Sequence, residues 1–496
     1  MKTVLCAVNS SYVHTNPAVR SIAAAVGGNA VFCEFNINQM ASDVLRALLL
    51  QEGDVYAFSC YIWNIAYVLR LAEDIKKAEP EAVITLGGPE VSFRAKSVIE
   101  QYWFVDYVIC GEAEECLKPF LEGIKRNARV DMPGIVFREG RAACGDDAYQ
   151  VVSNLDTLPS PFAAAGDEYD ENKIYYYESS RGCPFSCAYC LSGDCMGVRE
   201  KSLEHVFDEL QIFVKKGVKL VKFVDRTFNA NKTRAKKIVE YVIGKTENTS
   251  FHFEVALDLM DDELLCLLAS APTGKIQLEG GVQTTNKRTL DAVARKTDLS
   301  RLKENAKAIL KAGNIHLHLD LIAGLPYESM ERFALSFDEI YELYPDALQL
   351  GFLKVLHGTK LEQQAGGWGL ISRSYPPYEV IRTKDISARE LLYLKGIEEL
   401  LNRYYNTGRA KYSLQYLTQE QIFSPFELYA KLYDFCVRND YTGRPVSARN
   451  QFVLLIEFAK ETLCRTEQNV FLKRLRTDYD RTKIKGIIPR ELQETD

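Results

Sequence analysis

The stretch KIYYYESSRGCPFSCAYC, residues 173–190, joins a predicted strand to a cluster of cysteines. The strand covers residues 173–180, and Cys183, Cys187 and Cys190 follow it with the spacing C-x3-C-x2-C. Functional sites in parallel β/α folds lie at the carboxyl ends of the strands. The stretch therefore predicts a β/α fold with a functional site at the end of this strand.

Three thiolates so close in sequence can bind one iron–sulfur cluster corner by corner. A structural zinc site would normally need a fourth Cys or His ligand with tetrahedral spacing. Cys195 could supply that ligand. The residues by themselves therefore leave a zinc site as the alternative to an iron–sulfur cluster.

The region from residue 174 onward alternates predicted strands with helical patterns. In residues 203–214 the apolar side chains form one stripe, and Gly217 marks the end of that helix. Six β/α units are too few for a closed eight-stranded barrel, so they predict an open (β/α)6 partial TIM barrel. The predicted strands are residues 173–180, 218–225, 250–258, 275–283, 315–324 and 347–356.

Residues 1–125 show a second, separate β/α pattern. The strands are apolar throughout, as expected for a parallel sheet covered on both faces, so we predict a doubly wound, Rossmann-like domain. Asn16 can cap the first helix, and Pro17 stands at its first position, where a backbone N–H would have no partner within the helix. The predicted strands are residues 3–8, 30–35, 55–60, 82–88 and 105–110.

The remaining segments complete an α/β protein of four parts. Residues 126–173 predict a small hairpin, with arms at 134–138 and 149–152, followed by a linker. Residues 370–496 show amphipathic helix patterns and no convincing strand alternation. The expected domains are residues 1–125, the hairpin and linker at 126–173, the partial barrel at 174–369 and a helical C-terminal domain at 370–496.

Composition and charge exclude several classes of protein and indicate a cellular compartment. The net charge of −6 argues against a general nucleic-acid binder. The N-terminus lacks the apolar core of a signal peptide, and no run reaches the length of a membrane span, so we expect a cytoplasmic protein. Thirteen cysteines in such a protein are not a disulfide framework. The scattered ones, such as Cys266, are expected to be small buried hydrophobes.

The motif CPFSCAYC, with Tyr189 just before its last cysteine, resembles the radical S-adenosylmethionine (radical SAM) superfamily. The resemblance implies a [4Fe-4S] cluster on the three cysteines, with one iron open to the amino and carboxylate groups of S-adenosylmethionine. It also implies reductive cleavage to a 5′-deoxyadenosyl radical, with electrons from a donor such as flavodoxin or ferredoxin. Further residues that the resemblance assigns to S-adenosylmethionine binding are Tyr189, Asp225, Glu279, Gln283 and Asp320.

A doubly wound domain ahead of such a barrel resembles the cobalamin-binding class of the superfamily. That class binds the nucleotide tail at the carboxyl ends of strands. Its D-x-H-x-x-G element is missing here, because the loop around His14 lacks both the Asp and the Gly. We therefore expect base-off cobalamin without a histidine ligand. The residues expected to contact the cofactor are Ser59, Gly87, Gly88, Gly111 and Glu112.

Together the two resemblances imply methylation of an unactivated carbon or phosphorus centre in a small-molecule or other unidentified substrate. Radical rearrangement or cyclisation is an alternative. A methylthiotransferase is another, because Cys6, Cys33 and Cys60 could hold a second cluster, although each stands in an apolar strand. A cobalamin- or cluster-based sensor without turnover is the non-enzymatic alternative. Neither the substrate nor the oligomeric state follows from the sequence.

Overall fold

The computed structural model describes residues 1–28, 30–126, 130–163, 169–194, 197–246, 248–443, 445–482, 484 and 488–493. The chain forms two compact units. The first comprises Met1–Leu278, Lys354–Gln364 and Ser372–Glu379; the second comprises Glu279–Leu353, Ala365–Ile371 and Val380–Asp496.

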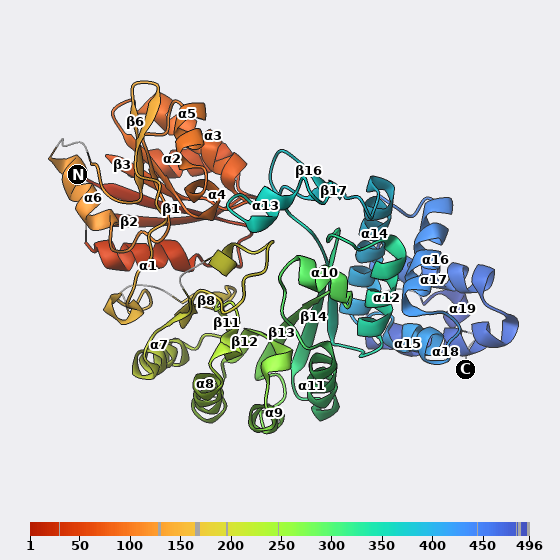
Figure 1. Ribbon diagram of the computed structural model, residues 1–496. Coiled ribbons are helices and arrows are strands. Elements are labelled where there is room, and N and C mark those ends of the chain that lie inside the picture. The colour runs from red at the N-terminus through yellow and green to blue at the C-terminus, as the bar shows by residue number, and fades with distance from the viewer. Residues whose placement is uncertain are drawn as a thin grey trace. The chain divides into compact units, whose positions relative to one another are not determined.

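The first unit begins with a doubly wound sheet (Figure 1). Its strand order is β2-β1-β3-β4-β5-β6-β7, and the first five strands run parallel. All five strands predicted for this domain are confirmed. They are β1 (Thr3–Asn9), β2 (Ala30–Asn36), β3 (Val55–Ser59), β4 (Val83–Gly87) and β5 (Tyr107–Ile109).

Helices cover both faces of this sheet. Apolar residues of α2, α3 and α5 pack on one face, and those of α1 and α6 pack on the other. The Asn16 side chain accepts a hydrogen bond from Val19 N at 2.9 Å, which confirms the predicted cap of α1. The helices are α1 (Pro17–Val26), α2 (Ala41–Leu49), α3 (Ile65–Ala78), α4 (Pro89–Ser92), α5 (Ala95–Gln101) and α6 (Leu117–Lys125).

The predicted hairpin is half right. Its first arm is β6 (Ile135–Glu139), but its second arm is β7 (Ala142–Gly145), so the prediction of residues 149–152 was wrong. Gly140 has a φ of 61°, which suits the two-residue loop that closes the hairpin immediately after Glu139. The hairpin extends the first sheet antiparallel to β5 instead of standing apart from it.

The described part of the predicted linker is packed against the protein. Leu155 and Leu158 are buried beside Val152, and the Phe162 ring lies 4.4 Å from that of Phe213 on α7 (Leu203–Lys216). This stretch includes the 3₁₀ turn η1 (Leu155–Thr157).

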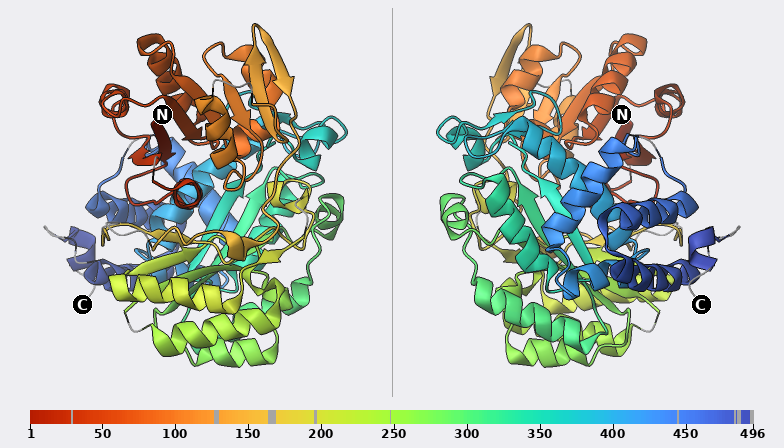
Figure 2. Two further views of the ribbon diagram at one scale, coloured as in Figure 1. Left: turned by 90° about the vertical axis from the view of Figure 1, so that its left-hand side faces the viewer. Right: turned by 90° about the vertical axis from the view of Figure 1, so that its right-hand side faces the viewer.

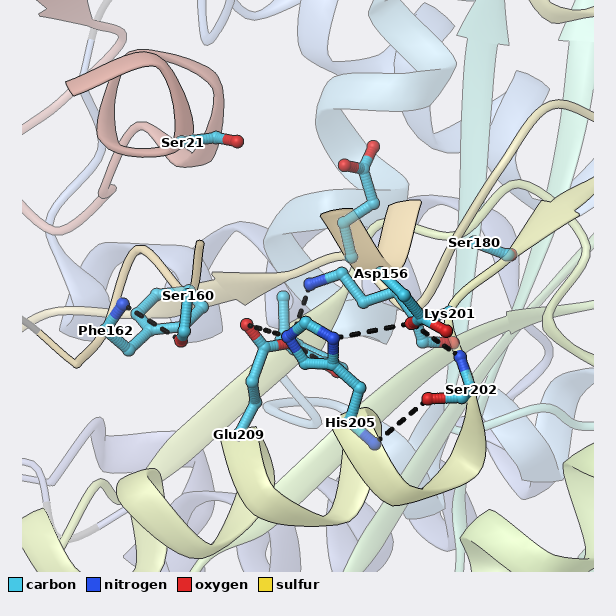
Figure 3. Close-up of polar contacts among 12 residues, drawn as sticks. Ser21, Asp156, Ser160, Phe162, Ser180, Lys201, Ser202, His205 and Glu209 are labelled. Atoms are coloured by element: carbon cyan, nitrogen blue, oxygen red, sulfur yellow. Dashed lines mark hydrogen bonds and ion pairs between the residues drawn. The ribbon is translucent and has the colours of Figure 1, made fainter. Parts of the chain in front are cut away.

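Polar contacts also attach the linker to α7. Figure 3 shows His205 of this helix between Asp156 of the linker and Glu209, with Nδ1 3.4 Å from the Asp156 carboxylate and Nε2 3.7 Å from the Glu209 carboxylate. Asp156 also accepts a hydrogen bond from Ser202 N at 2.8 Å. The described linker residues are therefore packed and hydrogen-bonded to α7 and to the residue before it.

A second sheet has the strand order β15-β14-β13-β12-β11-β8. All six predicted barrel strands are confirmed, and the division between the two units falls inside β13. In Figure 2, helices α7, α8 and α9 lie together along one side of their strands in the first unit. The strands are β8 (Tyr175–Tyr177), β11 (Leu220–Phe223), β12 (Ser250–Val255), β13 (Ile276–Gln283), β14 (His316–Ala323) and β15 (Ala347–Phe352).

Shorter elements complete the first unit. Two-residue strands β9 (Ser180–Arg181) and β10 (Arg199–Glu200) form an antiparallel ribbon around the cysteines. The other helices of this unit are α8 (Lys232–Lys245), α9 (Asp262–Ala269), α13 (Lys360–Gln364) and the 3₁₀ turns η2 (Leu191–Asp194), η3 (Phe228–Ala230) and η4 (Leu257–Leu259).

The second unit carries β14, β15 and a helical bundle, shown in blue in Figure 2. A two-stranded ribbon of β16 (Ile371–Ser372) and β17 (Val380–Arg382), not anticipated from the sequence, precedes the C-terminal helices. The helices are α10 (Lys287–Ala292), α11 (Leu299–Ala312), α12 (Met330–Tyr341), α14 (Ala388–Leu400), the π-helix η5 (Leu401–Asn406), α15 (Lys411–Gln419), α16 (Pro425–Arg438), α17 (Ala448–Thr462), α18 (Arg465–Arg481) and α19 (Arg490–Gln493).

Two further expectations concern membrane-spanning segments and the burial of the scattered cysteines. Among the described residues, no helix combines the length and the apolar character needed to cross a membrane. Cys6, Cys60, Cys110 and Cys436 are buried as expected, but Cys266 and Cys464 are exposed, so the prediction was wrong for these two residues. Cys266 on α9 faces solvent because Leu264 and Leu268 form the buried side of the helix.

Candidate functional site

The three clustered cysteines lie in a loop that begins just after β9. Cys187 is only 7% exposed, whereas Cys183 and Cys190 are half-buried. Cys190 N donates to Cys187 O at 3.0 Å, and the Cys183 sulfur lies 3.6 Å from the Thr227 hydroxyl. Tyr189 is also half-buried. Cys195 lies outside the described residues.

A short β-ribbon closes the base of this loop. Ser180 and Arg181 of β9 pair with Glu200 and Arg199 of β10, so the cysteines lie on the segment that connects the two strands. Gly182 has a φ of 94°, and a Cβ there would lie 2.1 Å from the carbonyl oxygen of Gly197. Only glycine therefore allows the two sides of the loop to approach this closely.

Asp225 holds the strand end in front of the cysteines. One carboxylate oxygen accepts Ser179 N at 2.7 Å and Ser180 N at 2.9 Å, and the other accepts the Ser179 hydroxyl at 2.5 Å. The residue is 1% exposed. Burial raises its pKa to about 6, although the bonds from the two serines oppose that shift. In the described structure, both oxygens of Asp225 are thus engaged within the protein.

Glu112, in the loop after β5, contacts the same ribbon. Its carboxylate lies 2.9 Å from Arg181 Nη1 and 2.6 Å from Arg199 Nη2. It also accepts a hydrogen bond from Val152 N at 2.8 Å. Burial alone would raise the pKa of Glu112, but the bond from Arg199 and the charge of Arg181 hold it below its ordinary value.

The residues expected to contact cobalamin lie at the carboxyl ends of β3, β4 and β5. Ser59 is 8% exposed, and its hydroxyl lies 3.4 Å from the Asn16 amide nitrogen. Gly88 has a φ of 101°, and a Cβ there would lie 2.7 Å from Cys60 O. Gly111 has a φ of 94°, and its Cβ would lie 2.2 Å from Gln150 O. Backbone packing therefore already requires glycine at Gly88 and Gly111, whereas Gly87 has no such tight contact.

His14, in the loop that follows β1, is engaged with β8. Its Nδ1 lies 2.7 Å from the Tyr176 hydroxyl, and its backbone pairs with Ile174. Burial lowers the pKa of His14, and the charge of Lys222 lowers it further. His14 therefore acts as a hydrogen-bonding residue between the first domain and β8.

Cys6, Cys33 and Cys60 lie in or beside the apolar core of the first domain. Cys6 and Cys33 are direct register partners on β1 and β2. Burial raises the pKa of all three thiols. A thiol must lose its proton to bind a metal, so this surrounding disfavours the second cluster of a methylthiotransferase.

The clustered cysteines differ from a preformed mononuclear site. Among the described residues, no three His, Cys, Asp or Glu side chains converge as ligands of one metal ion. In an iron–sulfur cluster each thiolate binds a separate iron, so three thiols spread along one loop fit that group.

Two further contacts around the loop gave no signal in the sequence. Leu361 N of α13 donates to Ala188 O at 2.8 Å, so a segment from far along the chain packs on the cysteine loop. The Tyr378 hydroxyl donates to Glu90, which also pairs with Arg94 at 2.7 Å. This segment, residues 354–364 and 372–379, thus attaches to both the loop and the first domain within one unit.

The other predicted ligand-binding residues belong to the second unit. Glu279 and Gln283 are half-buried on alternate positions of β13. Gln283 has a φ of 71°, and its buried Oε1 has no hydrogen-bond partner among the described residues. Asp320 on β14 lies 3.3 Å from His318 Nε2. A buried, unpartnered carbonyl on a strained backbone is one feature that functional sites show.

Comparisons with protein-family models match three successive regions. A model described as "B12 binding domain" matches residues 3–121, and one described as "Radical SAM superfamily" matches residues 177–340. A third, "Protein of unknown function (DUF4080)", matches residues 366–496. The first two matches confirm the resemblances found in the sequence.

Two curated relatives are 26% identical to this chain. One is the 2-(S-pantetheinyl)-carbapenam-3-carboxylate methyltransferase of Streptantibioticus cattleyicolor, over 333 residues. The other is the cobalamin-dependent radical SAM methyltransferase TokK of Streptomyces tokunonensis, over 332 residues. Each alignment covers 61% of this chain and 46% of the relative, so the chain spans about half the length of these proteins.

A solved structure has a similar fold along the whole chain. The cobalamin-dependent S-adenosylmethionine radical enzyme OxsB, with aqua-cobalamin and S-adenosylmethionine bound, superposes with a TM-score of 0.65. The alignment covers 100% of this chain and 83% of OxsB at 14% sequence identity. This likeness confirms the predicted fold class.

Proposed function

We propose that this radical SAM superfamily protein, with its N-terminal B12-binding domain, is a cobalamin-dependent methyltransferase that acts on an unactivated carbon or phosphorus centre. The observation that carries the proposal is the union of the cysteine loop and the B12-binding domain in one compact unit, where Glu112 of the domain binds both sides of the loop. The names of the two curated relatives also support methyl transfer.

In this proposal Cys183, Cys187 and Cys190 hold the [4Fe-4S] cluster. When bound, the cluster supplies the electron that cleaves S-adenosylmethionine, and cobalamin carries the methyl group. Tyr189, Glu279, Gln283 and Asp320 contact S-adenosylmethionine. Of these residues, Gln283 has the strongest structural support for a contact with S-adenosylmethionine. Its buried Oε1 can accept a hydrogen bond from a ligand without breaking a hydrogen bond within the protein.

The first domain holds base-off cobalamin in this proposal, with Ser59, Gly87 and Gly88 along the nucleotide tail. The engagement of His14 with Tyr176 supports the absence of a histidine ligand to cobalt. Glu112, Gly111 and Asp225 are better assigned to the frame of the site, since each is already bonded or packed within the protein.

The overall reaction balances with two molecules of S-adenosylmethionine and two electrons for each methylation. One S-adenosylmethionine loses its methyl group and becomes S-adenosylhomocysteine. The other yields methionine and 5′-deoxyadenosine, which keeps the hydrogen taken from the substrate. Flavodoxin or ferredoxin supplies the electrons in a cytoplasmic setting. The four-part domain division drawn from the sequence assigns binding of cobalamin to residues 1–125 and radical chemistry to residues 174–369.

Anaerobic reconstitution with iron and sulfide tests the cluster assignment. The wild-type protein should gain broad thiolate-to-iron absorption that dithionite bleaches. Replacement of Cys183, Cys187 and Cys190 together by Ala should abolish this absorption, and Cys195→Ala serves as the matched control. Loss of iron in the Cys195 variant would contradict the ligand set.

Product analysis tests the reaction class. Comparison of metabolites from cells with and without the protein identifies the substrate, and labelled S-adenosylmethionine then follows the methyl group. Methyl transfer predicts labelled product with about equal amounts of S-adenosylhomocysteine and 5′-deoxyadenosine. 5′-Deoxyadenosine formed with substrate turnover but without label in the product would replace methylation by rearrangement or cyclisation.

A further inference from the structure

We propose that Glu112 is a positioning residue that closes the base of the cysteine loop by neutralising two arginines that face each other. The sequence had assigned this residue to cobalamin. Only the identity of what the loop binds depends on the proposed function; the positioning role depends on the ion pairs themselves.

The two arginines are direct partners in the ribbon. Arg181 of β9 stands opposite Arg199 of β10, and the ribbon contains only one other residue pair, Ser180 with Glu200. Like charges directly opposite each other destabilise an antiparallel pair. So short a ribbon has little intrinsic stability to offset that repulsion. The base of the loop therefore needs a compensating negative charge.

Glu112, from the B12-binding domain, supplies the part of that charge that both arginines share. One of its oxygens lies 2.9 Å from Nη1 of each arginine, and the other lies 2.6 Å from Arg199 Nη2. The side chains of Glu112, Arg181 and Arg199 are 15%, 12% and 12% exposed. Water therefore screens these charges weakly, and the ion pairs carry more weight than surface pairs do.

Both arginines also have other partners. Arg181 pairs with Glu114 at 2.6 Å and with Glu178 at 2.7 Å. Glu112 binds both terminal nitrogens of Arg199, and Arg199 Nη1 also donates to Val152 O. Glu112 is a carboxylate that contacts both arginines, so loss of its charge should loosen both strands of the ribbon.

The loop that carries Glu112 is itself fixed by backbone contacts. Gly111 pairs with Gln150, and Glu112 N donates to Gln150 O at 2.9 Å. The carboxylate thus has a defined position at the carboxyl end of β5. Through the two arginines, that position determines where the cysteine loop begins and ends. A displacement of reacting groups by about 1 Å can greatly lower a reaction rate. A contact that fixes the cysteine loop relative to the B12-binding domain therefore matters if groups bound to each act on one substrate.

Hydrogen exchange of the full chain without cofactors tests the proposal independently of any activity. The variants are Glu112→Gln, Arg199→Gln and the double substitution, with exposed Glu115→Gln as the matched control. In Glu112→Gln we expect the amides of residues 180–190 to exchange about a hundredfold faster or more, as for a broken buried ion pair. The control should match the wild type, and the amides of β1 and β3 should stay protected in every variant.

The double variant separates positioning from ligand binding. Removal of the Arg199 charge should restore most of the lost protection, because the repulsion that Glu112 had offset is gone. If Glu112→Gln changes the electron paramagnetic resonance signal of the reduced cluster in reconstituted protein, the double variant should restore the wild-type signal. Unchanged exchange in Glu112→Gln, or a double variant that exchanges as fast as the single one, would overturn the proposal. Failure of the cysteine variants to alter iron binding would refute the proposed function and leave these exchange results intact.

Discussion

Asp225→Asn should remove a pH dependence from the stability of the first unit. Burial raises the pKa of this carboxyl to about 6, from an ordinary value of 3.8. Its folded-state pKa is raised, so its contribution to stability is complete below pH 3.8 and is lost as the pH rises through 6. At about 1.4 kcal/mol for each tenfold change in proton affinity, the full contribution is about 3 kcal/mol.

The effect can be worked out for two convenient conditions. At pH 5 about 1.4 kcal/mol of this contribution is still present, whereas at pH 7.5 almost none is left. Asparagine has nearly the same shape, and its carbonyl oxygen can accept from Ser179 N and Ser180 N. The Ser179 hydroxyl can then rotate to accept from the new amide group. The variant therefore keeps the hydrogen bonds but has no carboxyl to titrate.

Calorimetry at the two pH values measures the difference between variant and wild type. We expect the melting temperature of Asp225→Asn to rise relative to the wild type by about 3 °C between pH 5 and pH 7.5, at about 2 °C per kcal/mol for a unit of this size. Asp208→Asn, an exposed substitution of the same kind, is the control. A constant difference across this range would show that folding does not raise the pKa of Asp225. A variant that loses stability relative to the wild type at pH 7.5 would show that the folded protein needs the ionised carboxylate.

Two further substitutions test the loop and the second unit. Gly182→Ala should prevent iron loading, because the new Cβ would lie 2.1 Å from Gly197 O. Gly197→Ala is the control: it has a similarly positive φ, but its Cβ would meet no atom within 4 Å, so this variant should retain iron. Equal iron loading of both variants would contradict the steric argument. Burial raises the pKa of Glu328 to about 7. In the wild type, the second unit should therefore lose about 3 kcal/mol of stability as the pH rises from 4.5 to 8, and Glu328→Gln should remove this loss. Urea unfolding measures the stability at each pH, and a variant that keeps the wild-type pH dependence would refute this assignment.

Local patterns in the sequence were enough to predict both sheets. Buried parallel strands are continuous apolar runs, and helices carry apolar stripes, so their period is visible without any knowledge of the fold. Residues 173–190 could likewise be recognised because a strand and three cysteines are contiguous. The hairpin shows the limit of such patterns. The run 149–152 looked more like a strand than 142–145, but the tight turn at Gly140 placed β7 immediately after β6.

The sequence by itself thus determined the order of the elements, the doubly wound domain, the partial barrel and the spacing of the cysteines. Only the tertiary structure decided how the frame of the site is built. Glu112 lies 69 residues from Arg181 and 87 from Arg199, so no local pattern connects them. An exposed-looking carboxylate at a strand end has the same sequence signature whether it meets a cofactor or an arginine. Its role depends on which charge the fold brings within hydrogen-bonding distance and on how little water remains between them.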